Sequence, residues 1–161
     1  MKILGIDPGL KATGYGVIEA VDVLAGKLKL LEAGSIEPKP SDLLQSKLDK
    51  IYRHLSDVIR QYHPDYVVIE KLYAHHQYRT TAGIMGHARG VIFLACAHQK
   101  MTIAEHSVKR IRKALLGNGN ATKRQTHAAV ARLFGIDPKR LTLDASDALA
   151  LACGFAFMKR F

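Results

Sequence analysis

The chain opens with a short apolar run that ends in an acid and a tight turn. Residues 3–9 read Ile-Leu-Gly-Ile-Asp-Pro-Gly, so a strand-length run carries Asp7 at its carboxyl end before Pro8-Gly9 turns the backbone. An unpaired charge inside a protein is costly, so a buried strand rarely carries an acid that is neither paired nor bound to a cation. The plainer alternative is a turn acid that faces solvent, and this stretch alone leaves both interpretations open.

Periodic patterns predict that the first strand has antiparallel neighbours and a covering helix. Strand-like runs over 13–19 and 28–36 follow after short turns, which favours a meander with the first strand. Apolar residues at helical spacing over 43–62 predict an amphipathic helix, with Ser41 as its expected N-cap and Pro64 just beyond its end.

The next apolar run predicts a buried strand that also ends in an acid. Residues 65–70 are β-branched and close on Glu70, and the helix-length connection before them favours parallel pairing with the first strand. We interpret residues 72–80 as a loop. The remainder predicts a small-residue-rich helix over 81–99, a strand over 101–105, helices over 108–116 and 123–134 capped by Ser107 and Thr122, an end at Gly135, and a helix over 145–158 opened by Asp144.

Length and composition describe a single domain over residues 1–161. The chain is 48% hydrophobic and 24% charged, and its longest aliphatic stretches are too short to span a bilayer. No signal-peptide pattern precedes Asp7, and Cys96 and Cys153 lie in apolar surroundings, so we expect a cytoplasmic protein with buried thiols. The elements together predict an α/β fold, with a mixed sheet of about five strands flanked by helices.

The net charge of +10 is concentrated in the second half of the chain. Residues 1–80 carry 11 Lys and Arg against 10 Asp and Glu, whereas residues 81–161 carry 13 against 4. A basic half favours a polyanionic partner, and a solubilising surface is the plainer alternative. Six basic residues lie between 107 and 125 with no acid among them: Lys109, Arg110, Arg112, Lys113, Lys123 and Arg124.

The segment 72–80 interleaves aromatic and basic side chains. Such a mixture suits base stacking and phosphate contact in a nucleic-acid-binding loop. Two adjacent histidines could instead suggest metal binding, but without an evident third ligand we interpret them as surface residues. The side chains concerned are Tyr73, His75, His76, Tyr78 and Arg79.

Four acids stand at the ends of predicted elements. Asp7 and Glu70 end two strands, and their carboxylates converge at one edge if these strands are parallel neighbours. Asp144 and Asp147 share one face of the first turn of the last helix, where the positive end of the helix dipole favours negative charge. Ordinary capping explains the last pair taken alone, and Glu70 alone could be a surface acid.

A cluster of four carboxylates repels itself unless cations compensate the charge. Mg²⁺ prefers oxygen ligands, so we predict a site with two Mg²⁺ ions, for which Mn²⁺ is an alternative. Two such ions about 4 Å apart can activate water and stabilise the leaving oxygen in phosphodiester hydrolysis. An acidic metal site beside a basic surface therefore predicts a nuclease.

Four motifs follow one another along nearly the whole chain. They are Gly-Ile-Asp-Pro-Gly at 5–9 with Thr-Gly-Tyr-Gly-Val at 13–17, Ile-Glu at 69–70, His-Ala-Arg-Gly-Val at 87–91, and Asp-Ala-Ser-Asp-Ala-Leu-Ala at 144–150. In this order they resemble the RuvC family of Holliday-junction resolvases. The resemblance implies an RNase H-like fold, a homodimer, Mg²⁺, and paired symmetrical nicks in four-way DNA junctions during homologous recombination and DNA repair. It also implies a crossover junction endodeoxyribonuclease that works with a branch-migration complex of the RuvA and RuvB type.

The resemblance further implies catalytic roles for five residues. It makes Asp7, Glu70, Asp144 and Asp147 the metal-binding catalytic acids. Our mechanistic hypothesis is that Asp7 bridges or anchors both ions. The resemblance places Lys123 beside these acids, where an ammonium group would neutralise developing phosphate charge or orient the attacking water.

DNA contacts follow from the resemblance and from the basic stretch. Tyr73 falls where the family has an aromatic residue that stacks on a base of the junction. Arg112 stands where a Lys is common, and an Arg binds phosphate but cannot serve as a proton donor. The complete set of expected DNA contacts is Tyr73, Arg79, Arg112, Lys113 and Lys123.

The Gly- and Ala-rich stretch 83–97 is the candidate dimer interface, because small residues permit close helix approach; an ordinary core helix is the alternative.

Three other functions remain as rivals. A non-catalytic junction-binding module would lack the acids, and an actin-like kinase or ATPase would need two such domains. A single-domain RNase H-like nuclease that acts on RNA is the nearest rival.

Overall fold

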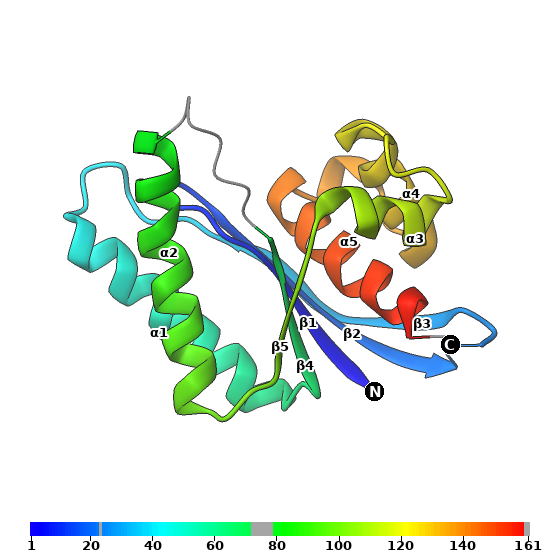
Figure 1. The fold of residues 1–161 in the computed structure, drawn as a ribbon, viewed down its shortest axis with the longest axis horizontal. Coiled ribbons are helices and arrows are strands. Elements are labelled where there is room, and N and C mark those ends of the chain that lie inside the picture. Colours follow the sequence, from blue (N-terminus) through cyan, green and yellow to red (C-terminus); the bar gives the residue numbers. More distant parts are fainter. Residues whose placement is uncertain (23, 72–78, 160–161) are drawn as a thin grey trace.

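A single mixed sheet runs through the molecule. The structure is a computed structural model that describes residues 1–22, 24–71 and 79–159, without the side chains of 79–82 and 84. The strand order is β3-β2-β1-β4-β5 (Figure 1). β1 pairs antiparallel with β2 and parallel with β4, as the sequence predicted, and β4 also pairs parallel with β5. The strands are β1 (Lys2–Asp7), β2 (Thr13–Asp22), β3 (Lys27–Ile36), β4 (Tyr66–Glu70) and β5 (Ile103–His106).

Helices cover both faces of this sheet. Figure 1 shows α1 and α2 together on one side of the strands and α3, α4 and α5 on the other. Covered faces on both sides explain why the central strands are apolar almost throughout. The helices are α1 (Leu44–Tyr62), α2 (Arg79–His98), α3 (Val108–Leu116), α4 (Lys123–Phe134) and α5 (Leu143–Met158), with a short 3₁₀ helix at Pro138–Arg140.

Successive residues of the central strands belong to two separate cores. Ile3 and Val68 pack with α5, whereas Leu4 and Val67 pack with α1 and α2. Because side chains alternate along a strand, the parity of each position fixes the face on which its side chain lies. Cys96 and Cys153 are free and buried, one in each core, as expected.

Two glycines allow α5 to lie directly on the sheet. A Cβ atom at Gly5 would lie 2.0 Å from the carbonyl oxygen of Ala148, and one at Gly14 would lie 2.0 Å from that of Asp144. No side chain can be accommodated at such distances, so glycine is required at both positions. The first turn of α5 is therefore held against the ends of β1 and β2.

Three helix boundaries confirm the sequence prediction. The Ser107 hydroxyl accepts the amide of Arg110 at the start of α3. Thr122 and Gln125 form a reciprocal capping box at the start of α4, and Gly135 ends that helix in the left-handed conformation.

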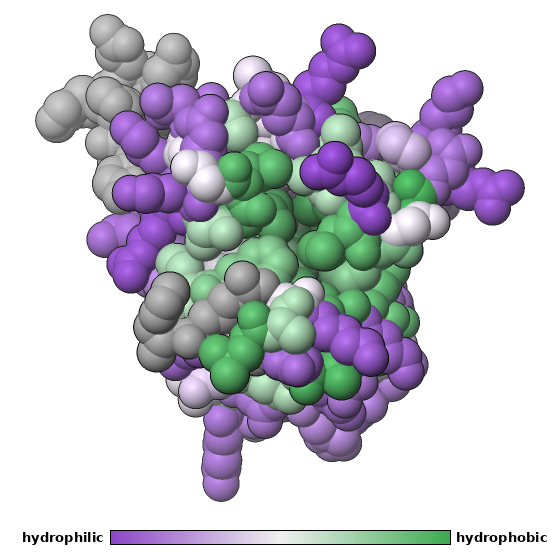
Figure 2. Space-filling model, turned by 90° about the vertical axis from the view of Figure 1, so that its right-hand side faces the viewer, coloured by the Kyte–Doolittle hydropathy of each residue, from purple (hydrophilic) through white to green (hydrophobic). Residues whose placement is uncertain are grey.

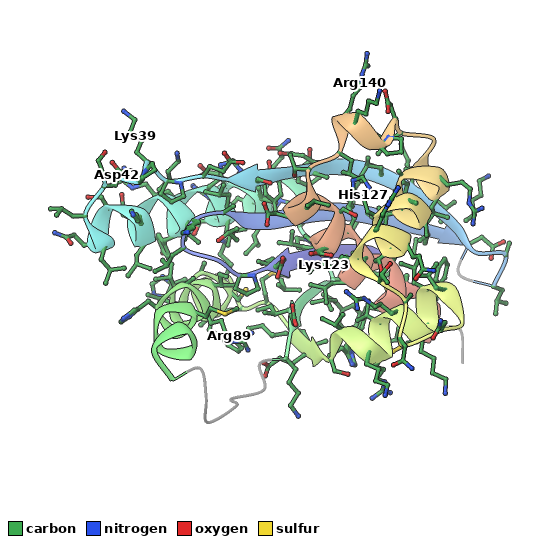
Figure 3. The ribbon with its side chains drawn as sticks, turned by 90° about the horizontal axis from the view of Figure 1, so that it is seen from above. Lys39, Asp42, Arg89, Lys123, His127 and Arg140 are labelled. Carbon is green, nitrogen blue, oxygen red and sulfur yellow. The ribbon has the colours of Figure 1, made fainter. Side chains whose placement is uncertain are left out.

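The prediction that Ser41 caps α1 is wrong. The Asp42 carboxylate accepts the amide of Lys39, whose carbonyl accepts the amide of Asp42 (Figure 3). This closed turn keeps the chain out of helical geometry until Leu44, and the N-cap position falls on Leu43 without a side-chain hydrogen bond.

The prediction that Asp144 opens α5 as its cap is also wrong. Thr142 is the N-cap, and its hydroxyl accepts the amide of Ala145 at 3.2 Å. Asp144 lies in the first turn of the helix instead. Its carboxylate is therefore not engaged in capping, and the capping explanation of the acid pair is removed.

One end of the helical layer formed by α3, α4 and α5 carries an apolar groove. Figure 2 shows apolar side chains gathered on this side of the molecule within a hydrophilic rim. The groove is lined by Leu115, Leu116, Ala129, Arg132, Leu133 and Phe157.

Across the described residues, none of the helices combines the length and the apolar character that crossing a membrane requires.

Candidate active site

Asp7 is the last residue of β1 and faces α5. Alternate residues of a strand point to the same face of the sheet, so Asp7 points to the same face as Ile3 and Gly5, which both pack toward α5. The turn that follows is fixed by Thr13, whose buried hydroxyl donates to the Gly9 carbonyl at 2.6 Å and accepts the Gly9 amide at 3.3 Å. This turn ends the strand where the carboxylate emerges.

Glu70 ends the neighbouring strand on the same side. Ile6 pairs with Ile69 in the parallel register, so Asp7 and Glu70 occupy the next position of their strands. Glu70 shares the parity of Val68, which packs against α5. The sequence prediction that these two acids converge at one sheet edge is therefore confirmed for their placement in the fold.

The first two turns of α5 bring the other two acids to this edge. Asp144 lies over Gly14, the β2 partner of Asp7, and Asp147 follows three residues later. The Lys123 ammonium, at the start of α4, donates to Asp147 Oδ2 at 2.8 Å (Figure 3 labels Lys123). Acids from β1, β4 and α5 thus meet a cation from α4.

These groups line a pocket of about 130 Å³ between the sheet edge and the helical layer. The lining combines three acids with the cations Arg112 and Lys123. Asp144 is half-buried beside the pocket but is not among its lining residues. The complete lining is Asp7, Glu70, Val108, Ile111, Arg112, Lys123, Thr126, Asp147, Ala150 and Leu151.

Asp7 is the acid whose charge is most strongly disfavoured. Burial, and after it the neighbouring carboxylates of Glu70, Asp147 and Asp144, raise the pKa of Asp7 from 3.8 to about 7, although Lys123 opposes this shift. Asp7 therefore lies within electrostatic range of the three other acids.

The pKa values of Glu70 and Lys123 also shift, for related reasons. Burial and then Asp147 raise the pKa of Glu70, against the lowering effects of Lys123, Arg112 and Arg89. The hydrogen bond to Asp147 is the largest influence on Lys123 and raises its pKa. The pocket therefore carries more negative charge than its cations compensate.

The donor set fits hard divalent cations in its chemistry. Carboxylate oxygens are the ligands that Mg²⁺ and Mn²⁺ prefer, and a cation would relieve the repulsion that raises the pKa of Asp7. Within the described part of the chain, no three His, Cys, Asp or Glu side chains are already grouped around one point for an ion. The Lys123 ammonium is hydrogen-bonded to the Asp147 carboxylate, so the side chains of this pair must rotate before Asp147 can bind an ion.

The expected DNA contacts are distributed unevenly. Arg112 lines the pocket, and its Nε atom is buried with no hydrogen-bond partner among the described residues. Lys113, the next residue of α3, is exposed and lies outside the pocket lining. Tyr73 falls outside the described residues, and Arg79 is described only as the first backbone position of α2.

Sequence reasoning missed one residue beside the site, Arg89. It entered only as a letter of the motif at 87–91, yet the guanidinium of Arg89, which Figure 3 labels, donates to the Glu70 carbonyl and pairs with Glu105. An available signal was that Arg89 is the single Arg of the helix predicted over 81–99, which is otherwise rich in small and apolar residues.

The arrangement defines the class of protein. Carboxylates at the ends of two adjacent parallel strands and on a covering helix, with two cations in the same pocket, characterise RNase H-like nucleases and resolvases. The yeast mitochondrial Holliday junction resolvase Ydc2 has a similar fold, with a TM-score of 0.67 over 98% of this chain and 79% of that chain, at 11% identity.

The chain belongs to the RuvC family of crossover junction endodeoxyribonucleases, whose family model matches residues 3–155. A family member from Rhodopirellula baltica is 39% identical over 94% of this chain and 84% of the relative. One from Lawsonia intracellularis is 35% identical over 100% and 93%. The structure of Thermus thermophilus RuvC in complex with a Holliday junction substrate superposes with a TM-score of 0.89 over 99% and 95%, at 26% identity.

Family membership implies a nuclease that depends on a divalent metal, which agrees with the chemistry of the carboxylate set.

Proposed function

We propose that this chain, as a single nuclease domain, resolves four-way DNA junctions by paired symmetrical nicks in recombination and repair. One observation carries the proposal. Glu70 of β4 and the two aspartates of α5 lie around Asp7 of β1, a partly buried acid whose pKa is raised to about 7, and the pocket also presents Arg112 and Lys123. Phosphodiester hydrolysis requires carboxylates that can bind metal ions and, next to them, cationic side chains that can bind the phosphate.

Asp7, Glu70, Asp144 and Asp147 would hold two Mg²⁺ ions, with Mn²⁺ as a substitute, and Asp7 would contribute to both. When bound, the ions supply Lewis-acid stabilisation of the attacking and leaving oxygens. The chain orients the carboxylates, because all four stand on rigid elements: two at the ends of β1 and β4 and two on α5. We expect Mg²⁺ affinity to rise as Asp7 ionises.

The two cations of the pocket act on the substrate. Lys123 exchanges its bond with Asp147 for the phosphate or the attacking water, and there compensates negative charge as it develops. Arg112 offers to a phosphate oxygen a buried Nε donor that has no hydrogen-bond partner within the described ranges. Because a guanidinium stays protonated, Arg112 binds and orients the phosphate and transfers no proton.

Contacts beyond the pocket would come from the basic second half of the chain. Lys113 is exposed on α3 and suits a phosphate of the DNA backbone. Tyr73 and Arg79 lie on the segment that follows Glu70, and we propose that they contact the junction, Tyr73 by stacking on a base.

Symmetrical cleavage requires two sites, so we propose a two-fold homodimer formed through α2. A Cβ atom would meet nothing within 4 Å at Gly83, Gly86 or Gly90, and Leu94, one turn further on, is 49% exposed. These positions follow one another along one helical face, where small residues allow close approach. Sedimentation of Leu94→Asp as a monomer, with the wild type a dimer, is the expected result; a monomeric wild type at micromolar protein contradicts it.

The resemblance also supports a cytoplasmic location and a branch-migration complex of the RuvA and RuvB type that delivers the junction. The expected measurement is co-sedimentation of this chain with such a complex only when a junction is present. Equal binding to the complex without DNA would place the contact elsewhere than on the junction.

A cleavage panel tests the proposed activity. We expect the wild type to nick a four-way junction, to leave linear duplex and structured RNA largely intact, and to lose activity in excess EDTA. Asp7→Asn should bind the junction and not cut it, whereas Asp57→Asn, an exposed ion-pair residue of α1, should cut normally. Preferred cleavage of RNA, or undiminished cutting by Asp7→Asn, overturns the proposal.

A further inference from the structure

Arg89 reaches from α2 to the strand end that carries Glu70. Its side chain is only 12% exposed, and its Nη1 donates to the Glu70 carbonyl at 2.5 Å. Its Nη2 forms an ion pair with Glu105, and its guanidinium lies 5.4 Å from the centre of the Phe93 ring. Charge, hydrogen bonding and packing therefore all fix this side chain in one place.

The Glu70 carbonyl needs a donor that the sheet does not provide. The backbone amides of Val67 and Lys71 donate to carbonyl groups on the β5 side of β4. Backbone groups of successive residues in a strand point to opposite sides, so the amide and carbonyl of Glu70 point toward β1. Continuing the register past Ile6 and Ile69, the β1 residue placed to donate to this carbonyl is Pro8, which has no N–H. Arg89 supplies the missing donor.

The partner of the ion pair lies on the adjacent strand. Glu105 of β5 is opposite Ile69, on the α2 side of the sheet, so its carboxylate faces the helix that carries Arg89. One guanidinium thus ties the last residue of β4 to β5 and to α2 at the point where the sheet edge becomes the acidic pocket. A planar fork suits two acceptors at fixed positions, which a single ammonium cannot serve equally well.

We propose that Arg89 is a positioning residue for the metal-binding acids: it fixes the end of β4, and so the direction of the Glu70 carboxylate, relative to α2. The inference rests on the proposed function, because it assigns Arg89 to the same site. The exposed glycine face of α2 is the proposed dimer surface, and Arg89 lies about 100° around the helix from Gly90, so the helix that carries the proposed dimer surface also holds the end of β4.

The test compares Arg89→Gln, Arg89→Lys and Glu105→Gln with Arg53→Gln, whose side chain forms an exposed pair with Asp49 on α1. Mn²⁺ binding is measured by calorimetry on the DNA-free protein, alongside junction binding, the kcat of junction cleavage and thermal unfolding. Residues that orient metal ligands typically change metal affinity 10- to 100-fold when replaced. We expect Arg89→Gln to weaken Mn²⁺ binding at least about tenfold and to lower kcat.

The expected pattern separates positioning from general destabilisation. Junction binding should stay within about twofold, Arg89→Lys should recover part of the Mn²⁺ affinity, and Arg53→Gln should leave it unchanged. Wild-type Mn²⁺ affinity in a folded Arg89→Gln protein overturns the proposal, as does an equal loss in Arg53→Gln. If Arg89→Gln does not fold, Glu105→Gln decides: Mn²⁺ affinity reduced about threefold or more supports the proposal, and unchanged affinity overturns it.

Failure of this proposal and failure of the proposed function are distinguishable. If the wild type does not cut junctions and Mn²⁺ binding still depends on Arg89, the positioning role stands and the junction activity does not. If the wild type cuts junctions and Arg89→Gln binds Mn²⁺ and cuts like it, the activity stands and the positioning role is overturned.

Discussion

Neutralising Asp7 should make the metal-free protein more stable while it abolishes activity. The Asp7 carboxyl has a pKa of about 7 in the folded chain against an ordinary value of 3.8. The folded state therefore holds a proton that the unfolded state releases, and stability falls as the pH rises from about 4 to about 7. A shift of this size corresponds to about 4 kcal/mol of destabilisation once Asp7 is ionised in both states.

Asp7→Asn removes that penalty, because an uncharged amide of similar shape replaces the carboxylate. In EDTA at pH 8.5 we expect the variant to unfold on the order of 10 °C above the wild type, from about 2–4 °C per kcal/mol in a protein of this size. At pH 5 Asp7 is still largely protonated in the folded state, and only about 1.6 kcal/mol of the penalty has developed, so the difference between the two proteins should shrink to less than half of its value at pH 8.5. Added Mg²⁺ should narrow the gap at pH 8.5, because it binds the folded wild type preferentially.

The assay is thermal or urea unfolding of wild type, Asp7→Asn and the control Asp57→Asn at both pH values. Asp57 is exposed and paired with Arg60 on α1, so its variant should show no gain that depends on pH. Equal stability of wild type and Asp7→Asn at pH 8.5, or the same difference at pH 5, refutes the reasoning.

Three further substitutions probe how the site is built. Gly14→Ala should lower the thermal midpoint by an amount equivalent to about 3 kcal/mol, because the new Cβ would lie 2.0 Å from the Asp144 carbonyl; a circular-dichroism melt unchanged from wild type contradicts this. Thr142→Ala should cost about 1 kcal/mol in urea unfolding through loss of the α5 cap, and no loss would mean that the hydroxyl is dispensable. Lys123→Met should reduce the kcat of junction cleavage about 100- to 1,000-fold with junction binding largely retained; a change in binding alone would assign Lys123 to DNA affinity only.

The sequence predicted the site well where acids directly follow apolar runs. Asp7 and Glu70 each end a strand-length apolar segment, and a helix-length connection between such segments favours parallel neighbours, so their convergence followed from topology alone. Ser107 and Thr122 were also predictable as helix caps, because they stand directly before periodic runs.

Local competition explains the two capping errors. Asp42 closes its own turn with Lys39 and so displaces the start of α1 beyond Ser41. Thr142 stands two residues before Asp144 and caps α5 with its hydroxyl, which leaves the carboxylate free. In both cases several capping residues lie close together, and sequence pattern alone does not rank them.

Contacts between distant elements were beyond sequence patterns. The bond from Lys123 to Asp147 and the reach of Arg89 to the Glu70 carbonyl depend on how α4 and α2 sit on the sheet. The glycines at 5 and 14 looked like ordinary strand or turn residues, although their role is to admit the backbone of α5. Tertiary packing fixes these features, and no local periodicity encodes them.

Calorimetric titration of Mn²⁺ into the DNA-free protein at pH 8 tests most directly whether carboxylates far apart in the chain form one metal site. The account predicts saturable binding to the wild type that is largely lost in Asp7→Asn and retained in Asp57→Asn. Mn²⁺ binding of equal affinity and stoichiometry in wild type and Asp7→Asn would contradict it.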